Sequence, residues 1–228
     1  AKKSLGAIGD ACWHCHSGVG AFPMQIATRF KIPLLIWGES IAESSGRASY
    51  ARPERKFDRD YFTKVSAKLS ASEMKGDGLS AKDMHPFELP SHEEIEKKGV
   101  WGLHLGDYLF WDEERQTEWI REVYGWKETE MEGAYKGYKS VECIMSGVHD
   151  FTGYLKRGMA RSTMQASVDV RNGLLTRKEG FDLIQLHEQE RPEVLDYYLK
   201  ITGLSEKEFY DVMREKKLKH LKDIDLPI

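Results

Sequence analysis

The stretch LLIW at residues 34–37 constrains the fold more than any other part of this sequence. It is a continuous apolar run bounded by Pro33 and Gly38, and such runs are typical of a strand buried on both faces in a parallel sheet covered by helices. Apolar residues spaced by four within residues 22–30 predict a helix just before it. A helix followed by a doubly buried strand predicts an α/β fold.

The rest of the chain predicts one more strand, within residues 102–111, and then mainly helices. Capping boxes at residues 176–179 (TRKE) and 205–208 (SEKE) open two of these helices. We therefore predict that residues 1–70 are the C-terminal part of a parallel α/β domain. Residues 71–228 are predicted to form a mainly helical domain with one strand near 102–111. Because doubly wound sheets need about four or five strands, we expect other strands to complete this sheet.

Composition excludes several classes of protein. The chain of 228 residues has 40% hydrophobic and 31% charged residues, which is typical of a soluble globular protein. Its net charge of −3 argues against a nucleic-acid partner. We find no apolar run near the ~18 residues of a membrane span and no signal peptide. With only three cysteines, we expect a reducing, cytoplasmic location.

Residues 12–16, CWHCH, are the most unusual local motif, because they hold two of the three cysteines. A redox dithiol, a zinc site and an iron–sulfur cluster all use CxxC, but the redox type expects a preceding strand and none is predicted before Cys12. With Cys12 and Cys15, Cys143 could be a third thiolate ligand and His14 or His16 a fourth ligand. The alternative is that Cys143 is a small buried core residue.

Polar residues follow the predicted strand at residues 34–37. Glu39 and Ser40 come at its carboxyl end, where open α/β sheets bind their ligands, so we predict them as catalytic residues. Trp37 and Gly38 are predicted to contact substrate or phosphate at the same edge. Alternatively, Ser40 only caps a helix.

Three arginines are candidate phosphate ligands: Arg157, Arg161 and Arg171, in KRGMARSTMQASVDVRNG. The guanidinium group suits bidentate recognition of phosphate. A solvated charged helix face is the alternative. No Walker loop and no GxGxxG fingerprint is present in the sequence.

The stretch CWHCHSGVGAFPMQIATRFKIPLLIWGES resembles the N-acetyl sugar amidotransferases of bacterial surface-polysaccharide biosynthesis, in the PP-loop (N-type ATP pyrophosphatase) superfamily. LGDYLFWDEERQTEWI, ECIMSGVHDFTGYLKRGMARSTMQASVDVRNG and RPEVLDYYLKITGLSEKEF continue the resemblance. It implies a Rossmann-like sheet of the adenine nucleotide alpha hydrolase type. It also implies that ATP adenylates a sugar acetamido group and that ammonia then forms an acetamidino group, in lipopolysaccharide O-antigen or nonulosonic acid synthesis.

The resemblance also implies cofactors and partners. ATP with Mg²⁺ would be the cofactor, a nucleotide-linked or free N-acetyl sugar the substrate, and a glutaminase with a synthase-like subunit the ammonia source. The SGGxDS phosphate loop of the superfamily is absent from this sequence. We therefore expect an N-terminal PP-loop half, in the same or a separate polypeptide, as the partner that completes the sheet.

The resemblance to this superfamily also suggests a role for the three cysteines. In its tRNA thiolation branch, three cysteines hold a [4Fe–4S] cluster with one open iron, a pattern that Cys12, Cys15 and Cys143 resemble. The resemblance therefore favours a cluster over zinc at these thiols. Two rival functions follow: an iron–sulfur-dependent sulfur transferase, and a non-catalytic, metal-stapled docking module.

Overall fold

The computed structural model describes residues 1–38, 61–109, 112–139 and 143–222. Its backbone divides into two compact units: unit 1, made of Ala1–Cys12 and Ile120–Ile228, and unit 2, made of Trp13–Trp119. These limits differ from the boundary near residue 70 suggested by the sequence, because the second strand pairs with the first. Among the helices described, none is long and apolar enough to cross a membrane.

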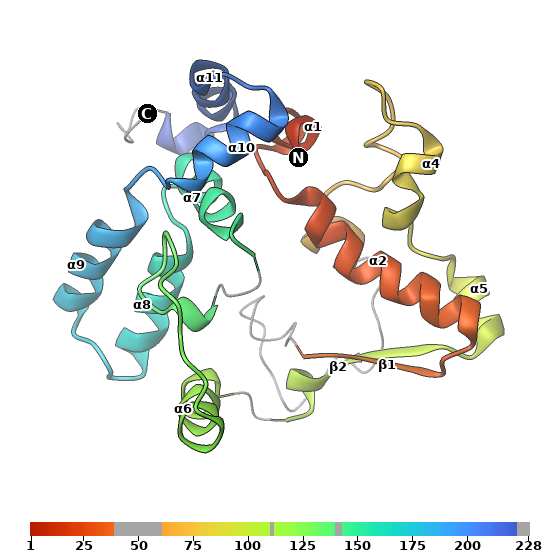
Figure 1. The fold of residues 1–228 in the computed structure, drawn as a ribbon, viewed down its shortest axis with the longest axis horizontal. Helices are drawn as coiled ribbons and strands as arrows, with labels where there is room; N and C mark the ends of the chain where they lie inside the picture. Colours follow the sequence, from red (N-terminus) through yellow and green to blue (C-terminus); the bar gives the residue numbers. More distant parts are fainter. Residues whose placement is uncertain (39–60, 110–111, 140–142, 223–228) are drawn as a thin grey trace. The chain divides into compact units, whose positions relative to one another are not determined.

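Unit 2 is built around one long helix and two short parallel strands. Helix α2 (Trp13–Phe30) lies across one face of the sheet formed by β1 (Leu34–Trp37) and β2 (Trp101–His104), as Figure 1 shows. Short elements complete the unit: the π-helical turn η1 (Tyr61–Ser66), α4 (Ala81–Met84), η2 (His85–Phe87), α5 (His92–Lys98), η3 (Leu105–Asp107) and most of α6 (Glu113–Tyr124). The predicted α/β class is confirmed, with a parallel sheet of two strands in the described part of the chain.

Helix α2 differs from the helix predicted over residues 22–30. It begins at Trp13, so CWHCH lies in its first turns rather than on a preceding loop. Its buried face carries small residues, and Phe22 and Phe30 are exposed. A Cβ atom on Gly20 would lie 2.2 Å from Cδ1 of Phe62, so glycine is required for Phe62 to pack against α2. Close approach by small residues, rather than the aromatic spacing, decided which face is buried.

The sheet of unit 2 is covered on only one face by described residues. Trp37 packs on that side in a small core with residues of α2, η1 and α5 and with Val100, which precedes β2; the other members are Met24, Ala27, Phe62 and Ile95. On the other side, Leu34, Ile36 and Trp101 are about half exposed. The prediction that LLIW is buried on both faces is therefore wrong for the described structure, although parallel sheets are normally covered on both sides.

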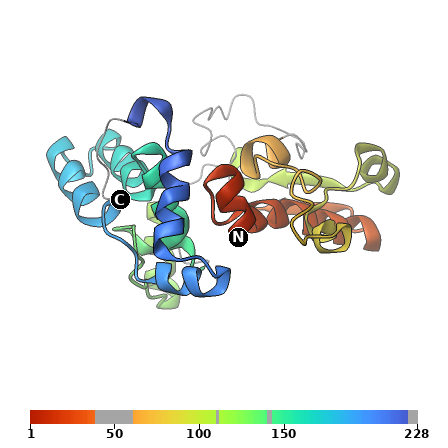
Figure 2. The same ribbon diagram turned by 90° about the horizontal axis from the view of Figure 1, so that it is seen from above.

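Unit 1 is helical and packs around α7 (Ser146–Arg157). The other helices are α1 (Lys2–Ile8), α8 (Arg161–Arg171), α9 (Arg177–Glu188), α10 (Val194–Thr202) and α11 (Glu206–Lys216), with the short turns η4 (Gly137–Lys139) and η5 (Lys219–Leu221). Figure 2 shows the blue helices α10 and α11 against the green helix α7. The capping boxes predicted at Thr176 and Ser205 are confirmed at the starts of α9 and α11.

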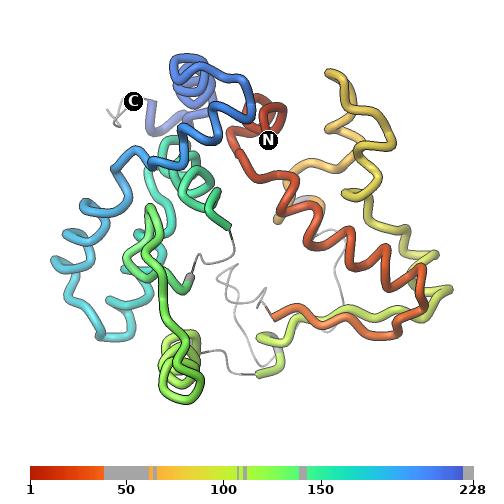
Figure 3. Tube along the Cα trace, viewed as in Figure 1, coloured from red at the N-terminus to blue at the C-terminus, as the bar shows by residue number. Residues whose placement is uncertain are grey.

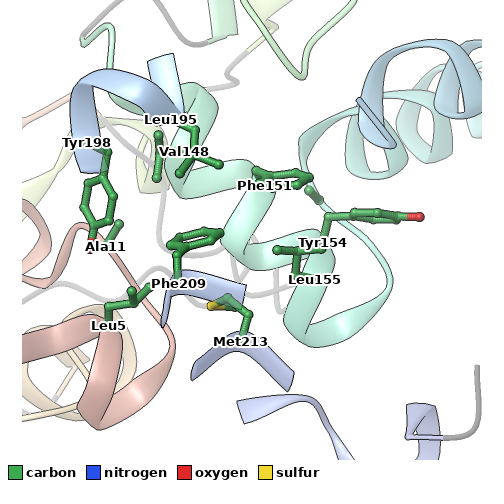
Figure 4. Packing of buried hydrophobic residues seen from close by; sticks show 11 residues of the cluster. Leu5, Ala11, Val148, Phe151, Tyr154, Leu155, Leu195, Tyr198, Phe209 and Met213 are labelled. Atoms are coloured by element: carbon green, nitrogen blue, oxygen red, sulfur yellow. The ribbon is translucent and has the colours of Figure 1, made fainter. Parts of the chain in front are cut away.

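The core of unit 1 is an aromatic cluster between α7, α10 and α11. Phe209 lies at its centre, with ring centroids 6.5 Å from Phe151 and 6.1 Å from Tyr198 (Figure 4). The other large, fully buried members are aliphatic or sulfur-containing: Leu5, Val148, Leu155, Leu195 and Met213. Together they bury enough apolar surface to make this the main stabilising contact of unit 1.

We expect Phe209→Ala to lower the free energy of unfolding by about 3–5 kcal/mol, because it leaves a cavity at the centre of this core. Urea denaturation followed by circular dichroism measures the loss. Phe181→Ala is the matched control, since Phe181 is 56% exposed whereas Phe209 is 0% exposed, and should cost less than about 0.5 kcal/mol. Equal losses in the two variants would contradict the assignment of the core.

The capping boxes predict that the stability of the protein depends on pH. Hydrogen bonds from the Ser205 side chain and backbone lower the pKa of Glu208, and Thr176 does the same for the pKa of Glu179. Because these folded-state pKa values lie below the unfolded ones, each box stabilises the protein at neutral pH. This stabilisation is lost as the pH falls through the folded-state pKa values.

We expect Ser205→Ala to raise the pKa of Glu208 and leave that of Glu179 unchanged, and Thr176→Ala to do the converse. Carboxyl carbon chemical shifts in an NMR titration would report both groups. If neither pKa responds to the loss of its own cap, the hydrogen bonds of the boxes do not persist in solution.

Candidate functional site

Only part of the predicted catalytic edge, at the carboxyl end of β1, lies within the described residues. Glu39 and Ser40 lie outside the described residues, and Gly38 is exposed. The side chain of Trp37 is buried, and its indole Nε1 donates a hydrogen bond to the Val19 carbonyl at 3.3 Å. The side chain of Trp37 is therefore part of the core of unit 2, and any contact of Trp37 with a ligand would come from its backbone.

His104 is a residue at this edge that the sequence reasoning did not identify. It ends β2, pairs in register with Trp37, and is 3% exposed. Its ring stacks on Trp37 with centroids 5.6 Å apart and on Phe62 at 5.7 Å. The alternation of GLHLG would have placed it on the inner face of a strand. The imidazole therefore lies at the carboxyl ends of the strands, next to the edge where parallel sheets bind their ligands.

The three cysteines have different surroundings. Cys12 is half-buried against the core of unit 1, whereas Cys15, on α2 in unit 2, is exposed. Cys143 is also exposed, and its Sγ accepts a hydrogen bond from the Met145 amide at 3.4 Å. The alternative that Cys143 is a buried core residue is therefore wrong. Because Cys15 belongs to the other unit, the three-thiol metal site stays a prediction.

The three arginines lie at helix ends in unit 1. Arg157 ends α7 and is exposed, while Arg161 and Arg171 are the first and last residues of α8, about 15 Å apart along its axis. The guanidinium of Arg171 donates a hydrogen bond to Ser167 one turn earlier. The Nε of Arg161 donates to Oδ2 of Asp150 at 2.7 Å. A phosphate at Arg161 would share the guanidinium with a buried carboxylate, so Arg157 and Arg171 are the more accessible candidates.

A buried carboxylate fixes the start of α8. Glu188 is 3% exposed and accepts hydrogen bonds from the backbone amides of Ala160 at 2.6 Å and Thr163 at 2.9 Å. Burial, and then the charge of Glu188, raise the pKa of the Tyr154 hydroxyl. Glu188 thus caps α8 as an acidic residue at a helix N-terminus should. No sequence pattern identifies it, because it lies 25 residues from Thr163.

The cavity beside this network is small. Asp150, His187 and Glu188 line it together with Gly133 and Gly147, and its volume is about 10 Å³. That is about the space of one water molecule. The described part of unit 1 therefore offers a buried water site here and not a pocket for a sugar or a nucleotide.

A second buried carboxylate holds the segment before α7 against α8. Figure 3 shows this segment running alongside α8. Asp169 accepts a hydrogen bond from the Tyr135 hydroxyl at 2.6 Å and one from Lys136 Nζ at 3.0 Å. It is 5% exposed, so the Lys136 ammonium compensates a charge that is costly to bury alone. We interpret this pair as a structural tether of residues 131–138.

The ion pair of Arg161 and Asp150 can be tested by stability. The side chains are 26% and 7% exposed, so Arg161→Ala leaves a nearly buried carboxylate without its cation. We expect a loss of about 2 kcal/mol in the free energy of unfolding, below the about 3–5 kcal/mol of a fully buried pair. Urea denaturation measures it, with Arg171→Ala as the control that changes stability by less than about 0.5 kcal/mol. An unchanged urea midpoint in Arg161→Ala would rule out the structural role.

Comparison with known proteins gives one family match, which covers the helical part of the chain. Residues 132–224 match the family described as "LPS biosynthesis protein WbpG-like, C-terminal domain". No curated protein matches the chain. The matched segment contains α7 to α11 and the buried networks of Asp150, Asp169 and Glu188. Over residues 132–224, the chain is thus similar to the C-terminal domain of a family of lipopolysaccharide biosynthesis proteins.

Proposed function

We propose that this chain is part of an ATP-dependent N-acetyl sugar amidotransferase in lipopolysaccharide biosynthesis. The observation that carries the proposal is the match of residues 132–224 to the C-terminal domain of lipopolysaccharide biosynthesis proteins. The parallel β1–β2 pair covered by α2 supports it, because such a pair is the elementary unit of a nucleotide-binding α/β sheet.

The proposed reaction has two steps. The acetamido oxygen of the sugar attacks the α-phosphorus of ATP, which forms an adenylated imidate and releases pyrophosphate. Ammonia then adds to the imidate carbon, and AMP leaves with the former amide oxygen, so that an acetamidino group remains. The catalytic contribution of the protein is to hold the phosphates and Mg²⁺ and to exclude water.

Within this chain, Gly38, Glu39 and Ser40 are the proposed edge of the nucleotide–sugar site. Arg157 and Arg171 are the proposed phosphate contacts, since both are exposed. Arg161 is retained as a third contact that would compete with Asp150. A polypeptide with the SGGxDS loop would bind ATP, and a glutaminase with its synthase-like subunit would supply ammonia. The proposed metal at Cys12, Cys15 and Cys143 would have a structural role.

The test is an assay for AMP with ATP, Mg²⁺, ammonium and a nucleotide-linked N-acetyl sugar. The purified chain is assayed alone and with the polypeptide that carries the SGGxDS loop. We expect AMP and pyrophosphate only with both parts present, together with a sugar product in which NH replaces the acetamido oxygen, detected by mass spectrometry. Absence of AMP from the combined proteins with all such sugars would overturn the proposal.

The arginines can be separated in the same assay. We expect Arg157→Ala and Arg171→Ala to lower kcat/KM about tenfold or more with an unchanged urea midpoint, because a phosphate contact is lost without a change in packing. Lys222→Ala, at an exposed position outside the described helices, is the matched charge control. Full activity in both arginine variants would remove these residues from the site.

A non-catalytic docking module is the second candidate. The observation that favours it is the half-exposed apolar face of the sheet at Leu34, Ile36 and Trp101. Exposed apolar patches of this kind mark interaction sites in many soluble proteins. On this hypothesis the AMP assay would stay negative in every combination.

A further inference from the structure

A hollow of about 270 Å³ lies along the first two turns of α6. Its described lining is Asp112, Arg115, Gln116 and Trp119, all in unit 2. Residues three, four and seven apart lie on one face of a helix, so these side chains border the same space. The volume is near the lower end of the range of small-molecule sites, about 300–1,000 Å³, whereas the cavity beside Asp150 has only about 10 Å³.

The side chains of this face are accessible to a ligand. Trp119 is 54% exposed, and Arg115 is exposed as well. Within the described ranges, the guanidinium of Arg115 and the side-chain amide of Gln116 form no hydrogen bond or ion pair with the protein. Oδ1 of Asp112 accepts a hydrogen bond from the Arg115 backbone amide at 3.0 Å, which holds the carboxylate at the start of α6. The buried residue of α6, Thr117, lies on the opposite face of the helix.

The four residue types match the chemical groups of a phosphorylated N-acetyl sugar. The negative face of the Trp119 indole attracts the C–H bonds that line one face of a pyranose ring. The side-chain amide of Gln116 offers an acceptor for the acetamido N–H and a donor for the acetamido oxygen. The carboxylate of Asp112 accepts hydrogen bonds from sugar hydroxyls, and the guanidinium of Arg115 suits a phosphate.

The chain connects this face to the carboxyl end of the sheet. β2 ends at His104 and continues directly into η3, which ends at Asp107. The chain from Asp107 to Asp112 spans at most about 18 Å, because an extended chain covers about 3.3–3.6 Å per residue. The start of α6 is therefore restricted to that distance from the end of η3, on the side where α/β sheets bind their ligands.

We propose that Asp112, Arg115, Gln116 and Trp119 bind the sugar and the adjoining phosphate of a nucleotide-linked N-acetyl sugar. The ring stacks on Trp119, the acetamido group contacts Gln116, and the phosphate contacts Arg115. The identity of the substrate rests on the proposed amidotransfer, whereas the binding residues rest on the hollow along α6. By its contact with the acetamido group, Gln116 would select N-acetyl sugars over sugars with a hydroxyl group at that position.

The test is calorimetric titration of the full chain, without ATP, with UDP-N-acetylglucosamine, UDP-glucose and UDP as probes. We expect UDP-N-acetylglucosamine to bind most tightly and UDP least tightly. Trp119→Ala should weaken binding of both sugar nucleotides about tenfold or more, whereas Trp119→Phe should keep most of the affinity. Gln116→Ala should weaken binding of UDP-N-acetylglucosamine about fivefold and leave UDP-glucose unchanged, because only the acetamido contact is lost. Arg115→Ala should weaken binding of all three probes.

Trp101→Ala is the matched aromatic control, since Trp101 is 58% exposed on β2, outside this face, and this variant should bind all probes like the unaltered protein. Far-UV circular dichroism shows which variants fold, and Arg115→Ala and Gln116→Ala keep good helix formers in α6. Failure of UDP-N-acetylglucosamine to bind, or unchanged binding in the folded Arg115, Gln116 and Trp119 variants, would overturn the site.

The AMP assay separates failure of this site from failure of the amidotransfer. AMP formed by the combined proteins, with an unchanged KM for the sugar in Trp119→Ala, would overturn the site and leave the amidotransfer in place. Absence of AMP in every combination, together with loss of sugar binding in Trp119→Ala and Gln116→Ala, would support the site and overturn the amidotransfer.

Discussion

Burial of α7 is the constraint on which unit 1 depends. The helix presents its apolar side chains to α10 and α11, but its polar residue Asp150 and both its glycines are buried as well. A Cβ atom on Gly147 would lie 3.0 Å from a carboxylate oxygen of Glu132 and 3.1 Å from a methyl group of Val194. Glycine at this position therefore allows the segment before α7 and the start of α10 to approach the helix closely.

The polar interactions of unit 1 follow from that burial. A helix enclosed on most sides carries polar side chains inward, where an unpaired charge is costly. The Arg161 guanidinium compensates the charge of Asp150. Asp10 lies beside His149, the residue that precedes Asp150 on α7. The same requirement explains the capping of α8 by Glu188. The segment similar to lipopolysaccharide biosynthesis proteins is therefore a closely packed helical unit whose internal cavity holds no more than about one water.

Unit 2 places its candidate chemistry at the edge of a sheet. β1 and β2 run parallel and end at Trp37 and His104, so Gly38 lies at the edge of the sheet where ligands usually bind. The opposite face, with Ile36 and Trp101, is apolar and half exposed. Both features fit a larger α/β sheet, which the proposed PP-loop partner would supply.

Local signals in the sequence predicted several elements correctly. The apolar run LLIW became β1, the alternating stretch after residue 100 became β2, and the capping boxes at Thr176 and Ser205 begin helices. These elements depend on neighbouring residues, so hydrophobic spacing and side-chain-to-backbone hydrogen bonds determine them without reference to the rest of the fold.

Contacts between distant segments could not be predicted in this way. The sequence placed Phe22 and Phe30 on the buried face of α2, but the close packing of Phe62 on Gly20 turned the small-residue face inward. It likewise treated Arg161 as a phosphate ligand, whereas the fold brings it to Asp150, and it gave no role to His149 or Asp10. The sequence by itself determined the class of fold, the starts of α9 and α11 and the two strands, because those follow from local periodicity and local capping. Only the tertiary structure decided which faces and charges are buried together, because burial depends on contacts between different helices and strands and not on the neighbouring residues of one element.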